Sequence, residues 1–234
     1  MNPFLFVALD DLAGKEKETF AIAKQLSDMP GNFGFKLNLD YLLNRTKSLE
    51  TIISKAQTLK RPIFADIKMW NGTRTMKSVF RTFVDLEVEY VNVYALADDL
   101  LPKAIEITEG TVTKVLGLTT LTHYDNTYCL KHFKRTLPET VLHFSEVAIE
   151  AGCHGVILPG TMLHTIKHIN TIKGVPGVRP NWYEDDRHEE EVTPKEAIEN
   201  GADILVVGGP IMKSAAPASA LEKILSEGFK KGGK

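Results

Sequence analysis

The segment that says most about this chain is Phe64-Ala65-Asp66-Ile67-Lys68-Met69-Trp70-Asn71. Its apolar start predicts a buried β-strand, and Asp66 and Lys68 follow where that strand ends. Residues i and i+2 of a strand point to the same side, so this carboxylate and ammonium are expected to meet. Charges beside a buried strand are costly unless they are paired or used. The segment therefore indicates either a plain ion pair that caps a strand or part of a functional site.

Outward from this segment, strand-like apolar runs alternate with stretches of helical periodicity. Most of the runs are short and several are rich in Val or Ile, as buried parallel strands are. The predicted strands are Phe4–Leu9, Phe33–Leu37, Pro62–Ile67, Tyr90–Tyr94, Thr113–Leu118, Gly155–Leu158, Gly174–Val178 and Ile204–Val207. The predicted helices are Lys15–Ser27, Leu49–Leu59, Met76–Leu86, Leu100–Thr108, Glu139–Ala151, Met162–Thr171, Pro194–Asn200 and Ala216–Glu227.

This alternation over 234 residues predicts an α/β fold, a (β/α)8 TIM barrel. A doubly wound open sheet is the alternative that the same pattern allows. No repeat, low-complexity stretch or linker-like composition divides the chain. We therefore expect one domain that spans residues 1–234.

Composition narrows the class of protein. Charged residues make up 25% of the chain and the net charge is −2, so there is no electrostatic case for binding nucleic acid or an acidic membrane. The two cysteines, Cys129 and Cys153, lack metal-ligand spacing and suggest a reducing compartment. No apolar run reaches membrane-spanning length, and the first residues lack the features of a signal peptide. We therefore expect a cytoplasmic protein.

Charged residues gather where the first three predicted strands end. In a barrel the chemistry belongs at those carboxyl ends, and the chain has Asp10, Lys36, Asp66 and Lys68 there. Each has an ordinary structural explanation, since Asp10 can cap the next helix and Lys36 can extend to solvent. Two carboxylates and two ammoniums at neighbouring strand ends nevertheless indicate a functional site.

At these residues the chain resembles the orotidine 5'-phosphate decarboxylase family, and the resemblance covers nearly its whole length. The family signature, Asp-x-Lys-x-x-Asp with Thr four residues later, is similar to the pattern of Asp66, Lys68, Asn71 and Thr75. Further similar segments are Phe6–Asp10, Phe35–Leu37, Leu121–His123, Pro176–Pro180, Val192–Pro194, Gly201–Asp203 and Val206–Ile211. The resemblance implies a barrel that dimerises, with its active site at the subunit interface and with neither a metal nor an organic cofactor.

The resemblance also implies a reaction, the conversion of orotidine 5'-phosphate to uridine 5'-phosphate in de novo pyrimidine biosynthesis. Lys68 would stabilise the negative charge that develops on C6 of the pyrimidine and would supply the replacing proton. Asp66 would hold Lys68 and lie near the substrate carboxylate. Lys36 would bind the ribose and orient Asp66, and Asp10 would also contact the ribose.

The other implied contacts lie around the base and the phosphate. Thr122 would contact the pyrimidine. Arg179 and the backbone of Gly208 and Gly209 would lie near the phosphate. Thr75 would reach across to the nucleotide bound by the partner subunit.

Several positions depart from the family pattern, including Tyr94 where the family often has His and His123 where it usually has Ser. Asn71 stands where the neighbouring subunit usually contributes the second signature aspartate, and its amide carries no charge, so we expect impaired decarboxylation. Gly209 stands where the family has an arginine, which removes a charge-assisted contact to the phosphate. His188 stands where the family has a glutamine, inside the acidic segment 184–191. We expect Arg187, His188 and Arg179 to take over part of the phosphate binding.

Two other functions remain open from the sequence. One is a related barrel enzyme that acts on another phosphorylated substrate, like hexulose-phosphate synthase or keto-gulonate-phosphate decarboxylase. Those relatives generally carry a metal-binding acid near the position of Lys36, so Lys36 favours the decarboxylase. The other is a non-catalytic nucleotide-binding homologue. Retention of four charged site residues counts against it, because unused buried charges destabilise a fold.

Overall fold

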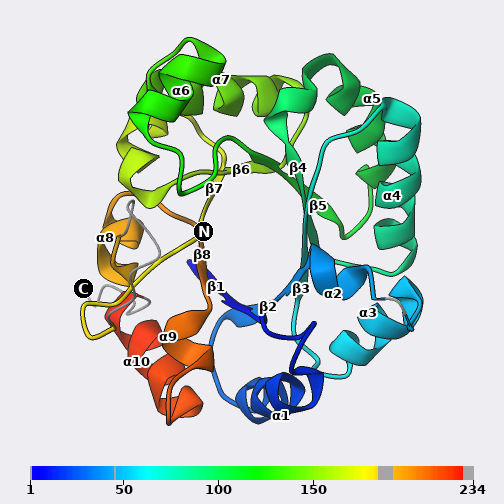
Figure 1. The fold of residues 1–234 in the computed structure, drawn as a ribbon, viewed down its shortest axis with the longest axis vertical. Helices are drawn as coiled ribbons and strands as arrows, with labels where there is room; N and C mark the ends of the chain where they lie inside the picture. Colours follow the sequence, from blue (N-terminus) through cyan, green and yellow to red (C-terminus); the bar gives the residue numbers. More distant parts are fainter. Residues whose placement is uncertain (1, 45, 184–191, 229–234) are drawn as a thin grey trace.

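A ring of parallel strands enclosed by helices forms the molecule (Figure 1). The computed structural model describes residues 2–44, 46–183 and 192–228. Its strands are β1 (Phe4–Ala8), β2 (Phe33–Asn38), β3 (Ile63–Met69), β4 (Tyr90–Tyr94), β5 (Lys114–Leu118), β6 (Gly155–Ile157), β7 (Ile172–Val175) and β8 (Ile204–Val207). They pair in chain order and β8 pairs with β1, which closes the barrel. The predicted (β/α)8 barrel is confirmed, and the open doubly wound sheet is wrong.

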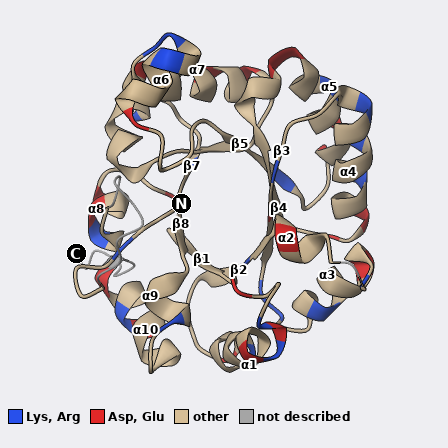
Figure 2. Cartoon of the chain, in the orientation of Figure 1, with Lys and Arg blue, Asp and Glu red and all other residues tan. Residues whose placement is uncertain are grey.

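Helices cover the outside of the barrel. They are α1 (Glu16–Ser27), α2 (Leu39–Leu42), α3 (Leu49–Gln57), α4 (Thr73–Asp85), α5 (Leu101–Ile105), α6 (Asn126–Phe133), α7 (Leu137–Glu150), α8 (Pro194–Glu199), α9 (Gly209–Met212) and α10 (Pro217–Gly228), with 3-10 helices η1 (Ala95–Leu100), η2 (Glu106–Thr108) and η3 (Gly160–Ile166). Charged residues of both signs are scattered over this helical ring (Figure 2). Within the part of the chain that the structure describes, no helix is both long and apolar enough to cross a membrane.

Local signals in the sequence set several helix ends. The predicted start of α8 is confirmed: Thr193 Oγ1 accepts a hydrogen bond from the backbone N–H of Glu196, and the Glu196 carboxylate accepts one from the N–H of Thr193. This reciprocal capping box satisfies two backbone donors that a helix start leaves without partners.

The region before β7 differs from the prediction. The expected helix Met162–Thr171 is wrong, since the chain forms the shorter 3-10 helix η3 there and enters β7 two residues earlier than expected. The strand then ends at Val175, because Pro176 has no N–H to donate to a sheet and Gly177 adopts φ 72°. The segment Pro176–Pro180 is thus a loop at the carboxyl end of β7 rather than its continuation.

A second difference is α6, which periodicity did not reveal because polar residues interrupt its short apolar pattern. Its start is fixed by Asp125, whose side chain accepts a hydrogen bond from the N–H of Tyr128. The helix ends at Phe133, and the next residue, Lys134, adopts the left-handed conformation. The helix follows the loop after β5, and it is this loop that lines the site described below.

The barrel interior is filled by apolar side chains from alternate positions of the strands, as expected for this fold. This inner cluster consists of Phe6, Ala8, Phe64, Leu116, Leu118, Ile157, Ile204 and Val206. The Phe6 ring packs edge-on against the rings of Phe64 and Tyr90, with centroids 5.4 and 5.3 Å away. A larger apolar cluster packs the outer face of the sheet against the helices. The interior is therefore a packed floor rather than a pore.

Candidate active site

A cavity of about 260 Å³ lies at the carboxyl ends of the strands, above the packed interior. Ala8, Phe64, Leu118, Ile157 and Val206 of the inner cluster form its apolar floor. The polar groups around it come from Asp10, Lys36, Asp66, Lys68, Asn92, Thr120, Thr122, His123, Arg179, Gly208 and Gly209. This is the face of the barrel at which enzymes of this architecture hold their substrates.

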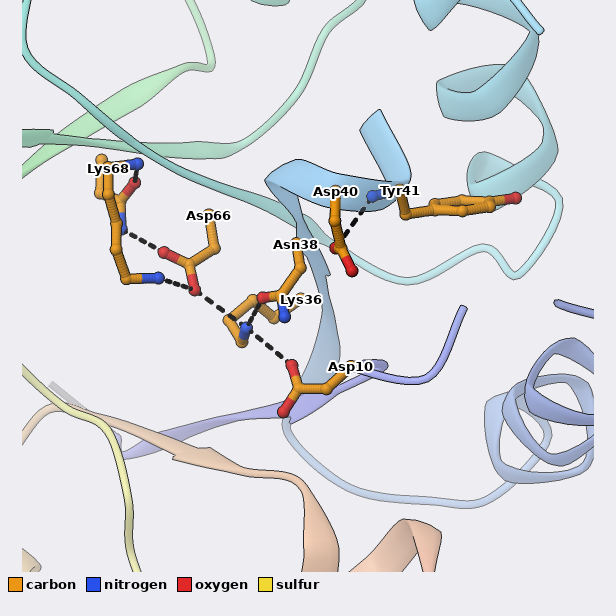
Figure 3. A network of polar contacts seen from close by, with 8 residues as sticks. Asp10, Lys36, Asn38, Asp40, Tyr41, Asp66 and Lys68 are labelled. Atoms are coloured by element: carbon orange, nitrogen blue, oxygen red, sulfur yellow. Dashed lines mark hydrogen bonds and ion pairs between the residues drawn. The ribbon is translucent and has the colours of Figure 1, made fainter. Parts of the chain in front are cut away.

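The centre of the cavity wall is an array in which two lysines share one carboxylate (Figure 3). Asp66 Oδ2 lies 2.9 Å from Lys36 Nζ and 2.7 Å from Lys68 Nζ. Lys36 Nζ also lies 3.0 Å from Asp10 Oδ1, and it donates a hydrogen bond to the side-chain oxygen of Asn38. The ends of β1, β2 and β3 thus bring together the four charged residues that the sequence predicts to converge.

Burial and charge together set the protonation of this array. Burial would raise the pKa of Asp66, but the ammonium groups of Lys36 and Lys68 outweigh it and lower that pKa to about 2. Burial would also lower the pKa of Lys36, but the carboxylates of Asp66 and Asp10 outweigh it and the pKa is raised. Both residues are therefore ionised at neutral pH.

Of the two lysines of the array, Lys68 is the one that is open to the cavity. Its side chain is 39% exposed, whereas those of Lys36 and Asp66 are each 8% exposed. The buried Lys36–Asp66 pair therefore forms a fixed base, and the Lys68 ammonium extends from it toward whatever occupies the cavity. A preorganised cation in a partly desolvated wall can stabilise negative charge that develops on a bound molecule.

The backbone at Lys68 is strained. Its φ is 44°, a left-handed conformation that costs a residue with a side chain about 1–2 kcal/mol. The strand register shifts at the same place, because Ala65 pairs with Val91 but Met69 pairs with Val93. Such a bulge bends a strand and re-aims a side chain next to a functional site.

Asn92 is a site residue that the sequence reasoning missed. It is 1% exposed in the middle of β4. Its Nδ2 donates to Asp66 Oδ1 at 2.6 Å, and its Oδ1 accepts the backbone N–H of Lys68 at 2.7 Å. One amide thus orients the shared carboxylate and replaces the strand pairing that the bulge removes. The available signal was a single polar residue inside the apolar strand Tyr90–Tyr94.

The remaining predicted residues divide into two groups. Thr122, Arg179, Gly208 and Gly209 line the same cavity as the charged array. Asn71 and Thr75, which were expected to serve a partner subunit, are not among its lining residues.

Asn71 lies on the surface of the protein. It is exposed, and its side chain accepts a hydrogen bond from the N–H of Gly72 at 2.8 Å. The predicted phosphate ligands Arg187 and His188 lie outside the described residues. Among those that are described, no group of three or more His, Cys, Asp or Glu side chains could hold a metal ion.

The chain is similar to proteins of one family along nearly its whole length. A sequence model described as "Orotidine 5'-phosphate decarboxylase / HUMPS family" matches residues 3–224. The orotidine 5'-phosphate decarboxylase of Carboxydothermus hydrogenoformans is 31% identical over 241 aligned residues, which cover 97% of this chain and 96% of that protein. The protein of the same name from Wolbachia sp. subsp. Brugia malayi is 30% identical and covers 96% of this chain and 98% of its own length.

A solved structure agrees with the sequence comparison. The crystal structure of orotidine 5'-phosphate decarboxylase from Lactobacillus acidophilus superposes with a TM-score of 0.79 at 25% identity. The match covers 98% of this chain and 100% of that chain.

Acid unfolding tests the charge state of Asp66. Its folded-state pKa of about 2 lies below the unfolded value of about 3.9. The Asp66 carboxylate therefore stabilises the fold above about pH 4, and this contribution of about 2–3 kcal/mol is lost as the pH falls through about 2. Urea unfolding at several pH values should show that Asp66→Asn loses less unfolding free energy over this range than the wild type. If the unfolding free energies of the variant and the wild type fell equally with pH, the ionised state of Asp66 would be contradicted.

Replacement of Asn92 tests its bridging role. Asn92→Leu leaves Asp66 Oδ1 and the N–H of Lys68 without their amide partner, so we expect the unfolding free energy to fall by about 2–4 kcal/mol. The exposed Asn181 provides the control, because Asn181→Leu should change stability by less than about 0.5 kcal/mol. Equal stability of the two variants in urea unfolding would show that Asn92 does not support the array.

Proposed function

The chain belongs to the orotidine 5'-phosphate decarboxylase / HUMPS family, and from this premise we propose that it is a carboxy-lyase that converts orotidine 5'-phosphate to uridine 5'-phosphate in de novo pyrimidine biosynthesis. The observation that carries this proposal is the Asp66 carboxylate held between Lys36 and Lys68 at 2.9 and 2.7 Å in the cavity wall. We propose further that residues 1–234 act as one domain in the cytoplasm.

The cavity can accept the three parts of this substrate separately. The apolar floor suits the flat pyrimidine ring, with Thr122 as a polar contact at its edge. Asp10 and Lys36 offer charged partners to the ribose hydroxyls. Arg179 and the backbone of Gly208 and Gly209 follow β7 and β8, and loops in this position commonly bind phosphate in (β/α)8 barrels.

The chemistry follows from the position of Lys68. Breaking the bond between C6 and the carboxylate releases CO₂ and leaves the electron pair on C6. The Lys68 ammonium stabilises this charge, then transfers a proton to C6 to form uridine 5'-phosphate, and regains a proton from solvent. Asp66 holds the ammonium in place, and its negative charge disfavours the bound substrate carboxylate more than the transition state.

Gly209 leaves room for a tyrosine in the altered phosphate region. A Cβ atom placed on Gly209 would lie 2.6 Å from the hydroxyl oxygen of Tyr183, so the arginine of the family pattern would require this tyrosine to shift. The Arg179 guanidinium lies 5.7 Å from the centre of the same ring. Arg179 lines the cavity together with Gly208 and Gly209, which supports it as the cation for the phosphate. The contribution of His188 stays a proposal that the described residues do not test.

The alternative barrel enzymes act on other phosphorylated substrates and use a metal-binding acid near the end of the second strand. In this chain Lys36 occupies that position, and its ammonium already bonds to Asp10 and Asp66. A second cation there would be repelled, which favours the decarboxylase. The intact array likewise favours an enzyme over a non-catalytic nucleotide-binding homologue.

We propose that the protein is a homodimer in which Asn71 and Thr75 reach the partner's nucleotide. Support comes from an apolar surface around α2, α3 and α4, where Leu39, Leu43 and Trp70 are 41%, 71% and 60% exposed beside a groove of about 360 Å³. Exposed apolar patches of this kind mark interaction surfaces. Trp70 directly precedes Asn71, so a second copy seated here would come close to Asn71 and Thr75.

Turnover of orotidine 5'-phosphate tests the proposed function. The loss of substrate absorbance, followed with a chelator present, should be rapid in the wild type and at least about 1,000-fold slower in Lys68→Ala. Lys77→Ala removes an ion pair with Glu106 away from the cavity and should retain wild-type activity. Turnover that the chelator abolishes, or that survives in Lys68→Ala, would contradict the proposal.

The change Asn71→Asp tests the departure from the family signature. A second carboxylate beside the partner's Lys68 would hold its ammonium in position, so we expect the turnover number to rise about tenfold, which equals about 1.4 kcal/mol of transition-state stabilisation. Asn126→Asp adds the same charge at the start of α6 and should have no effect. Equal rates in all three proteins, or light scattering that gives the mass of a single 26.0 kDa chain, would contradict this role.

A further inference from the structure

One side chain fastens the loop after β7 to the outer ring of helices. Trp182 Nε1 donates a hydrogen bond to the Glu227 carboxylate of α10 at 3.1 Å. The Lys223 ammonium of the same helix lies 4.6 Å from the centre of the Trp182 ring. The half-buried indole also packs against the large apolar cluster between sheet and helices. The loop thus runs from the strand ends to the side of α10, as Figure 1 shows.

The next residue along the loop contacts the cavity wall instead. The Tyr183 hydroxyl lies against Gly209, since a Cβ atom on this glycine would be 2.6 Å from the hydroxyl oxygen. The Arg179 guanidinium lies 5.7 Å from the centre of the Tyr183 ring, within the range of a cation–π contact. Arg179 and Gly209 both line the cavity. The Tyr183 ring therefore supports the arginine at the cavity wall.

A tight turn connects the anchored end of this loop with the cavity end. The N–H of Tyr183 donates to the carbonyl oxygen of Pro180 at 2.9 Å, and the proline ring fixes φ of this buried residue. The N–H of Arg179 donates to the carbonyl oxygen of Val192 at 2.9 Å, which holds the start of the turn against the chain that enters α8. The turn has little freedom of its own, so the seat of Trp182 on α10 helps to decide where Arg179 and Tyr183 lie.

The position of this turn matters for an anion at the cavity. A long side chain on a loop loses conformational freedom when it binds, and this loss weakens the affinity unless the loop is already ordered. The apparent dissociation constant equals the intrinsic one divided by the fraction of molecules in the binding arrangement. An anchor that keeps this fraction high therefore strengthens binding without touching the ligand.

We propose that Trp182 is a positioning residue for phosphate binding, because it holds the turn on α10 and so keeps Arg179 and Tyr183 in place at the cavity. Trp182 is not among the residues that line the cavity, so it acts through Arg179 and not by contact. This inference rests on the proposed function, under which Arg179 is the cation for the phosphate of the nucleotide.

Inhibition of turnover by uridine 5'-monophosphate and by uridine, which lacks the phosphate, tests the proposal. Trp182→Ala should weaken inhibition by the nucleotide about three- to tenfold, the loss expected if the binding arrangement falls to between a third and a tenth of the molecules. Inhibition by uridine should change less than about twofold. The KM for orotidine 5'-phosphate should rise with the nucleotide inhibition constant while kcat changes less than about twofold, as when binding is lost equally in ground and transition states.

Surface variants of α10 separate the anchor from general damage to the fold. Glu227→Ala removes the acceptor of the indole N–H and should weaken nucleotide inhibition about threefold, whereas Glu227→Gln keeps an acceptor and should match the wild type. Glu222→Ala removes an exposed carboxylate from the same helix and should also match the wild type, which controls for the change of charge. Where Trp182→Ala fails to fold, Glu227→Ala carries the test.

A double-mutant cycle tests whether the anchor acts through the arginine. Arg179→Ala alone should weaken nucleotide inhibition about ten- to hundredfold, the loss of a charge-assisted contact. In the Arg179→Ala background, Trp182→Ala and Glu227→Ala should cause no further loss, because the group that they position is gone.

Each contrary result has a distinct meaning. Equal losses for the nucleotide and for uridine, wild-type inhibition in both Trp182→Ala and Glu227→Ala, or losses that add to that of Arg179→Ala would overturn the positioning role, while turnover by the wild type left the proposed function standing. A wild-type protein that neither consumed orotidine 5'-phosphate nor bound uridine 5'-monophosphate in a calorimetric titration would instead overturn the proposed function, and with it the role of Trp182.

Discussion

The open end of this barrel depends on one carboxylate. Asp66 Oδ2 contacts the ammonium groups of Lys36 and Lys68, and Asp66 Oδ1 accepts a hydrogen bond from the Asn92 amide. Both oxygens of the carboxylate therefore have partners. Without that carboxylate, two ammonium groups would lie close together in a wall of low polarity, where like charges cannot both be kept. The ends of β2, β3 and β4 are therefore linked by the same group that positions Lys68, and Asp10 after β1 joins them through Lys36.

The array also explains the irregular backbone beside it. A regular β3 would continue its pairing with β4 through Lys68, but the register shift and the φ of 44° turn Lys68 out of the ladder. The strain is tolerated because Asn92 accepts the freed N–H and Asp66 holds the ammonium. The strained backbone at Lys68 lowers the stability of the fold, but it holds the Lys68 ammonium in place before a ligand binds.

The sequence predicts the barrel and the charged array for the same reason. Parallel strands leave clear apolar runs, and their carboxyl ends meet, so Asp10, Lys36, Asp66 and Lys68 can be brought together without coordinates. Asn92 could not be assigned this way, because its role depends on the register shift between β3 and β4. The contact between Gly209 and Tyr183 joins distant loops, and the role proposed for Asn71 and Thr75 needs a second chain.

A crystal structure of the protein with uridine 5'-monophosphate tests the central claim most directly, namely that the Asp66 array aims Lys68 at the reacting carbon. The account predicts C6 within about 3.5 Å of Lys68 Nζ, the distance of a productive approach, with Lys68 Nζ still bonded to Asp66. A nucleotide whose C6 lies away from Lys68, or a Lys68 ammonium turned out of the cavity in the complex, would contradict it.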